Sequence, residues 1–180
     1  MVHNILIAYA SKHNATKEIA ERIGFTLSSG NLNITIASVE KVADVTQFTV
    51  VILGSAVYFG QWRMSAAKFI KDNKSELLQK KVWIFSSGPL GRRPVYKLTK
   101  YWDFDASLND LFLSVNPISI VTFHGAINKS RLNFLENEVL KQIKIPLRDY
   151  RQWDHIQAWA QTINGHLTKS SNQLKIEKFA

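Results

Sequence analysis

Short apolar runs alternate with segments of helical periodicity along most of this chain. The candidate strands lie at 4–9, 33–38, 49–54, 81–86 and 118–123, and the third of them (TVVILG) is apolar and β-branched almost throughout. Strands that are apolar on both faces are typical of a parallel sheet covered by helices on both sides. The alternation therefore predicts an α/β fold with a doubly wound parallel sheet.

Helices are expected between these strands. They are predicted at 15–28, 64–78, 105–113 and 153–167. An additional helix is predicted at 129–144, where apolar residues follow i, i+3, i+4 spacing. A chain of 180 residues suits a single domain. We expect this domain to span 1–168 and a polar C-terminal tail to occupy 169–180.

The composition excludes several classes of site. The chain contains no cysteine, so a disulfide framework, a thiolate metal site and a cysteine nucleophile are excluded. The five histidines show no ligand spacing, and no metal site is predicted. The formal net charge of +9 suits an anionic partner, but no nucleic-acid-binding motif accompanies it, so nucleic acid is not expected. The sequence shows no signal peptide and no apolar run of transmembrane length, which favours a cytoplasmic location.

The first predicted strand runs directly into a turn that is rich in hydroxyl and amide side chains. This turn, from Ser11 to Thr16, precedes the helix predicted at 15–28. A helix N-terminus offers free N–H groups and a partial positive charge, and it can therefore bind a phosphate group. A capped helix without any ligand is the alternative, and this segment alone does not separate the two.

Two further loops leave the carboxyl ends of predicted strands, where ligands bind in doubly wound sheets. The second loop, 54–63, is aromatic, and the third, 86–91, is rich in glycine. A polar, an aromatic and a glycine-rich loop together predict a phosphorylated aromatic ligand such as flavin mononucleotide (FMN). The alternative is that the aromatic residues only pack in the core. The candidate cofactor-binding residues are Ser11, Lys12, His13, Asn14, Ala15, Thr16, Ala56, Val57, Tyr58, Phe59, Gly60, Trp62, Ser87, Gly88, Pro89, Leu90 and Gly91.

These motifs resemble those of flavodoxin-fold proteins over nearly the whole chain. The turn from Ser11 to Thr16 stands where flavodoxins carry a Ser/Thr-x-Thr-Gly-Asn-Thr phosphate loop, and it differs from that pattern at His13, Asn14 and Ala15. The resemblance implies a five-stranded parallel sheet in the order 2-1-3-4-5 with helices on both faces. It also implies FMN as the cofactor, with its phosphate held by Ser11, Asn14, Thr16 and backbone N–H groups of 12–16.

A narrower resemblance is to the bacterial menaquinone-linked protoporphyrinogen oxidases and related flavodoxin-domain proteins. It depends on the loop 54–62, on Phe-His-Gly-Ala at 123–126 with the helix 129–144 that follows, and on the pattern 149–160. This resemblance implies an FMN-dependent oxidoreductase that passes electrons from an organic, porphyrinogen-like donor to a quinone. The catalytic residues stay unknown, because no acid–base residue stands out.

Positive charge surrounds the proposed flavin loops. Lys12, Arg63, Arg92 and Arg93 lie in or beside these loops, which contain no Asp or Glu. One cation about 6 Å from the flavin stabilises its reduced anion by roughly 3 kcal/mol before solvent screening. We therefore predict a flavin that is less reducing than that of an acidic flavodoxin. Arg92 and Arg93 could also pair with substrate carboxylates.

Several alternatives stay open at this stage. The chain could be a non-enzymatic electron carrier that docks on acidic partners, or a flavodoxin-fold module that has lost FMN. The helix 129–144 and the basic segment 92–100 have the composition for peripheral contact with an anionic membrane, although such helices usually cover core. A homodimer is also left open.

Overall fold

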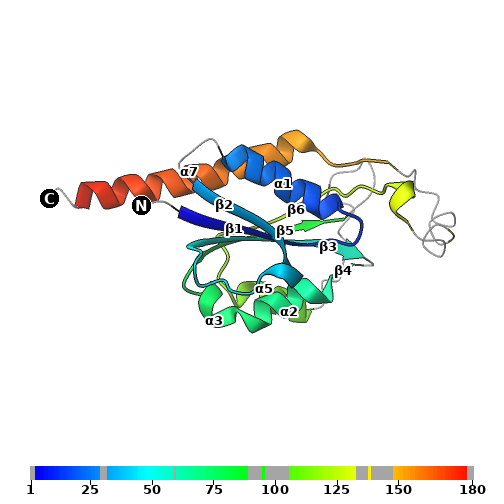
Figure 1. Cartoon of the computed structure of the whole chain (residues 1–180), viewed down its shortest axis with the longest axis horizontal. Coiled ribbons are helices and arrows are strands. Elements are labelled where there is room, and N and C mark those ends of the chain that lie inside the picture. Colours follow the sequence, from blue (N-terminus) through cyan, green and yellow to red (C-terminus); the bar gives the residue numbers. More distant parts are fainter. Residues whose placement is uncertain are drawn as a thin grey trace.

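A parallel sheet forms the centre of the molecule in the computed structural model (Figure 1). The structure describes residues 3–28, 32–58, 60–88, 95, 106–132, 138 and 148–177. The parallel strands are arranged in the order β2-β1-β3-β5-β6. Their bounds are β1 His3–Ala10, β2 Leu32–Ser38, β3 Val50–Tyr58, β5 Lys81–Ser87 and β6 Ser119–Phe123. Counted along the chain, the parallel strands follow the predicted order 2-1-3-4-5, and the predicted α/β fold class is confirmed.

Two layers of helices cover the sheet. Figure 1 shows α1 (Ala15–Leu27) and α7 (Trp153–Glu177) on one face, and α2 (Met64–Asp72), α3 (Lys74–Leu77) and α5 (Ala106–Leu113) on the other. Helices on both faces bury both sides of each central strand, which explains why these strands are apolar at almost every position. No helix in the described part of the chain is both long enough and apolar enough to cross a membrane.

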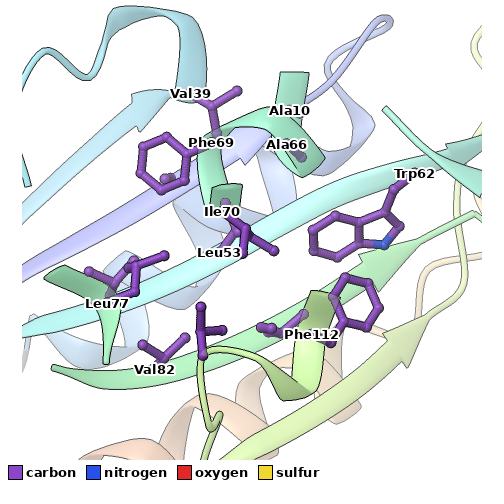
Figure 2. Close-up of a cluster of buried hydrophobic side chains, with 14 of the residues drawn as sticks. Ala10, Val39, Leu53, Trp62, Ala66, Phe69, Ile70, Leu77, Val82 and Phe112 are labelled. Atoms are coloured by element: carbon purple, nitrogen blue, oxygen red, sulfur yellow. The ribbon is translucent and has the colours of Figure 1, made fainter. Parts of the chain in front are cut away.

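Alternate residues of each strand supply the two cores. In β1, Ile5 and Ile7 face α1 and α7, whereas Leu6 and Ala8 belong to the core under α2 and α5. Figure 2 shows the second of these cores. Its labelled side chains are Ala10, Val39, Leu53, Trp62, Ala66, Phe69, Ile70, Leu77, Val82 and Phe112.

Strand β3 is longer than the sequence indicates. It was predicted to end at Gly54, but its ladder continues because Ser55 pairs with Ala10 of β1 and Ala56 pairs with Ser87 of β5. The strand then folds back into a short antiparallel strand, β4 (Gln61–Trp62). Most of the predicted second loop is therefore strand, and only two residues of the chain stand between β3 and β4.

The helices differ from the prediction at three places. The helix predicted at 64–78 is divided into α2 and α3 at Asn73, whose side-chain amide donates to the carbonyl oxygen of Phe69 at 2.9 Å. The backbone of α7 continues to Glu177, beyond the predicted end of this helix at Leu167. The predicted helix at 129–144 begins with a 3₁₀ turn at Lys129–Arg131, and most of the rest of it lies outside the described residues.

Candidate functional site

The three loops predicted to bind a ligand meet at one edge of the sheet. The carboxyl ends of the parallel strands lie side by side there, because Ala10 of β1 is in register with Ser55 of β3, and Ser87 of β5 with Phe123 of β6. This is the edge at which β1 leads into α1 in Figure 1. The sheet therefore brings the polar first loop, the aromatic turn and the start of the glycine-rich third loop together.

The first loop enters α1 through a left-handed residue. Asn14, the N-cap of α1, has φ 64° and ψ −1°, and its side chain makes no capping hydrogen bond. Its carbonyl oxygen accepts the backbone N–H of Glu18 at 3.0 Å, which begins the helix. Asn is the non-glycine residue that best tolerates this conformation, so it can replace the glycine of the flavodoxin pattern.

Two hydroxyl groups lie buried in the first loop. The Oγ atom of Ser11 has no hydrogen-bond partner among the described residues. Thr16 is fully buried, and its Oγ1 atom lies 2.9 Å from Oγ of Ser87 at the end of β5. A buried hydroxyl without a partner is costly unless a ligand or a water satisfies it, so the orphaned Ser11 hydroxyl fits an anion-binding loop.

The predicted aromatic residues of the second loop occupy different environments. Tyr58 is partly exposed, and its ring meets His13 of the first loop edge to face, with centroids 6.3 Å apart. Trp62 is buried in the core, where it packs on Phe112 with a centroid distance of 4.4 Å (Figure 2). Its Nε1–H donates to Oγ of Ser86 at 2.8 Å. Tyr58 thus lies beside the first loop, while Trp62 helps to hold β4 against β5.

The other described residues of the second loop lie in β3, at Gly60 and at the start of α2. Ala56 and Val57 are buried within β3, and Gly60 has φ 79° in the turn to β4. Phe59 lies outside the described residues. The backbone N–H of Arg63 donates to Oγ of Ser55 at 3.1 Å, which fixes the start of α2 to the end of β3.

The third loop begins in close contact with the segment after β6. The backbone N–H of Gly88 donates to the carbonyl oxygen of Phe123 at 3.3 Å. A Cβ atom at Gly125 would lie only 3.0 Å from Cα of Gly88, so any other residue at 125 would crowd the Gly88 backbone. Pro89, Leu90, Gly91, Arg92 and Arg93 lie outside the described residues.

Sequence reasoning missed an ion-pair cluster on the outer side of the first loop. Glu18, in the first turn of α1, accepts Arg131 Nη1 at 2.8 Å on Oε1 and Arg151 Nη1 at 2.7 Å on Oε2. Asp149 binds the other side of Arg151, with Nη2 to Oδ2 at 2.8 Å and Nε to Oδ1 at 2.9 Å. No local pattern connects Glu18 with either arginine, because more than a hundred residues separate them.

The arginines change the acidity of both carboxyl groups. Burial alone would raise the pKa of Glu18, but hydrogen bonds and charge from Arg131 and Arg151 lower it overall. The pKa of Asp149 is lowered in the same way, because Arg151 outweighs the effect of burial. Both groups are therefore carboxylates at neutral pH, and all three ion pairs of the cluster are charged.

A cavity of about 450 Å³ adjoins this cluster. It opens between the first loop with the first turn of α1, the segment after β6 and the segment that precedes α7. The residues that line it are His13, Ala15, Glu18, Ala126, Ile127, Asn128, Arg131, Asp149 and Arg151. Within the described ranges, no group of three His, Asp or Glu side chains could hold a metal ion.

Comparisons with known proteins agree with this architecture. Residues 6–152 match the family model described as a flavodoxin domain. No curated protein sequence gives a significant match. A short-chain flavodoxin associated with a bacterial microcompartment is similar in structure, with a TM-score of 0.54, 19% identity, and coverage of 79% of this chain and 99% of the flavodoxin.

Two further solved structures share the fold. Rubredoxin:oxygen oxidoreductase from Desulfovibrio gigas gives a TM-score of 0.57 at 13% identity over 92% of this chain, but only 36% of that protein is covered. A flavoprotein from Lactobacillus acidophilus, solved in complex with FMN, gives a TM-score of 0.50 at 14% identity. That match covers 67% of this chain and 93% of the flavoprotein.

Proposed function

Because the chain belongs to the flavodoxin-domain family, we propose that it is an FMN-binding oxidoreductase of the flavodoxin type. The observation that carries this proposal is the first loop. It combines the N-terminus of α1, a left-handed Asn14 and the buried Ser11 hydroxyl that no described residue satisfies. A phosphate group would satisfy that hydroxyl and the free N–H groups of the helix together.

The proposed phosphate contacts are Ser11, Asn14 and Thr16, with backbone N–H groups from 12–16. The ring of FMN would lie between the second and third loops, beside Tyr58 and Gly88. Bound FMN would supply one- and two-electron transfer. The protein's part is to hold the phosphate, to orient the ring and to set the electrostatic field around it.

That field favours electron acceptance by the flavin. Lys12 and Arg63 are cations in the first and second loops, whereas the nearest first-turn carboxylate, Glu18, is paired with two arginines. Positive charge stabilises the reduced, anionic flavin and raises its potential. A flavin of this kind suits an organic donor, of porphyrinogen type in our proposal, and a quinone acceptor. Contact with the membrane in which quinones reside would involve 92–100 and 129–144, which lie largely outside the described residues.

Flavin binding is the decisive test. Purified protein should absorb near 450 nm, or apoprotein should bind added FMN in a fluorescence titration. Ser11→Ala should weaken FMN binding about tenfold to hundredfold, the effect of losing one hydrogen bond to a charged group. Ser75→Ala is the matched control, because Ser75 is exposed in α3 on the opposite face of the sheet. A colourless protein that does not bind FMN would overturn the proposal.

A non-enzymatic electron carrier is the second candidate. Its support is the likeness to a short-chain flavodoxin over nearly the full length of that protein. Turnover of a porphyrinogen with a quinone acceptor favours the oxidoreductase. Rapid electron exchange with a protein partner, without such turnover, favours the carrier.

A further inference from the structure

Three consecutive carbonyl groups of the first loop are held in place by hydrogen bonds. The carbonyl oxygen of His13 accepts Arg131 Nη1 at 3.0 Å. The carbonyl oxygen of Asn14 accepts the N–H of Glu18 at 3.0 Å. The carbonyl oxygen of Ala15 accepts Arg151 Nη1 at 3.1 Å. Two of these three donors are guanidinium groups of residues that lie more than a hundred positions later in the chain.

Because each peptide unit is planar, a fixed carbonyl group also fixes the orientation of the N–H group in the same unit. In a trans, planar peptide unit the N–H points away from the C=O of the same unit. Fixing the carbonyls of His13, Asn14 and Ala15 therefore turns the N–H groups of Asn14, Ala15 and Thr16 to the opposite side. No acceptor for these three N–H groups lies in the part of the chain that the structure describes. They are free to bind a phosphate group on that side.

One carboxylate holds both arginines. The two oxygens of Glu18 bind Arg131 and Arg151 separately, and Asp149 fixes the remaining face of Arg151. The Arg151 side chain is only 7% exposed, and its guanidinium lies 4.4 Å from the centroid of the Trp153 ring. The position and the plane of the Arg151 guanidinium are therefore fixed by these contacts. A side chain that positions the backbone of the first loop needs to be held in this way.

We propose that Arg131, Arg151 and Glu18 are positioning residues that aim the N–H groups of the first loop at the flavin phosphate. This inference rests on the proposed function, because it concerns the same phosphate. The charges of the two arginines are balanced by those of Glu18 and Asp149. The cluster therefore acts on phosphate binding by orienting the N–H groups of the first loop, and it adds no net positive charge. A lysine at position 151 keeps the charge but cannot form the planar, forked set of contacts.

Arg151→Lys keeps the positive charge but removes the contacts that orient the loop, so it tests the proposal. Affinities of apoprotein for FMN and for riboflavin, which lacks the phosphate, are measured by fluorescence quenching. Arg151→Lys should weaken FMN binding about tenfold and leave riboflavin binding within twofold. Arg131→Gln should act in the same direction. Because Arg131 is considerably more exposed than Arg151, this second variant tests the proposal even where Arg151→Lys fails to fold.

Arg148→Lys is the matched control. Arg148 is exposed and stacks only on the ring of Tyr150 among its described side-chain contacts, so FMN affinity should not change in this variant. Equal weakening of FMN and riboflavin in Arg131→Gln would show a general structural role and overturn the proposal. Unchanged FMN affinity in both variants would overturn it as well.

A measurement without flavin separates this inference from the proposed function. Inorganic phosphate added to ¹⁵N-labelled protein should shift the amide signals of Asn14, Ala15 and Thr16, and the shifts should be smaller in Arg131→Gln. Absence of these shifts in the wild type would overturn the inference. A wild type that shows the shifts but does not bind FMN would instead overturn the proposed function.

Discussion

Asn14 shows how a single backbone angle shapes the candidate phosphate site. Its φ of 64° turns the chain from β1 into α1 and leaves the next N–H groups facing outward from the helix. The flavodoxin pattern has glycine at this position, where the left-handed conformation carries no side-chain penalty. The free-energy cost of the left-handed conformation is larger for Asn than for Gly but smaller than for most other residues.

Substitutions at Asn14 should therefore separate backbone strain from side-chain chemistry. Asn14→Gly should preserve or slightly increase the free energy of unfolding, whereas Asn14→Ala should decrease it by about 1 kcal/mol, because alanine pays more for the left-handed conformation. Urea denaturation measures both. Equal stability of the glycine and alanine variants would contradict a strained residue at this position.

At the scale of elements, Glu18 joins three parts of the fold. It lies in the first turn of α1 and binds Arg131 in the 3₁₀ turn after β6 and Arg151 immediately before α7. Helices α1 and α7 cover the same face of the sheet (Figure 1). The same ion pairs that orient the first loop thus connect the end of the flavodoxin domain with its beginning.

The lowered pKa of Glu18 predicts how these connections respond to acid. The unfolded chain has the ordinary pKa of 4.5, so it takes up a proton before the folded protein does as pH falls. The stabilisation is therefore complete above this value and is lost as pH falls through the lower, folded pKa. Glu18→Gln should destabilise the protein near pH 7, and the difference from wild type should shrink below about pH 4.

Urea denaturation at both pH values measures this difference. The control is Glu21→Gln, because Glu21 is half-exposed and pairs only with Lys17, at 3.5 Å, among the described residues. It should change stability little at either pH. A Glu18→Gln effect that is the same at both pH values would argue against the ion pairs as its source.

At the scale of the whole molecule, the net charge of +9 distinguishes this chain from acidic flavodoxins. Charge of one sign attracts oppositely charged reactants over distances of about 10 Å at moderate salt, and added salt weakens this attraction. Electron partners with negative charge should therefore be favoured kinetically.

Small redox reagents test this effect once the flavin is bound. The rate at which reduced protein transfers electrons to ferricyanide, an anion, should fall as ionic strength rises from about 0.01 to about 0.5 M. The rate with hexaammineruthenium(III), a cation, should rise over the same range. Stopped-flow absorbance at 450 nm measures both. The opposite salt dependence would show that the field at the flavin is negative in spite of the net charge.

Much of the fold could be predicted, because burial in a doubly wound sheet leaves a local pattern. Apolar runs marked the parallel strands, and the family resemblance supplied their order, which is confirmed. Element ends were less accurate. Strand β3 extends to Tyr58 because β1, β4 and β5 supply its partners. Helix α2 ends at Asp72, and the capping residue Asn73 donates its side-chain amide to the carbonyl oxygen of Phe69. Such partners are not visible in a local window of sequence.

The sequence by itself determined the alternation of strands and helices and the position of the hydroxyl-rich first loop, because both depend on neighbouring residues. Only the tertiary structure decided which aromatic residue faces outward: Tyr58 is exposed beside His13, while Trp62 is buried against Phe112. It also brought Arg131 and Arg151 onto Glu18. These contacts join residues that are far apart in the chain, and their geometry exists only after the sheet has placed its carboxyl ends side by side.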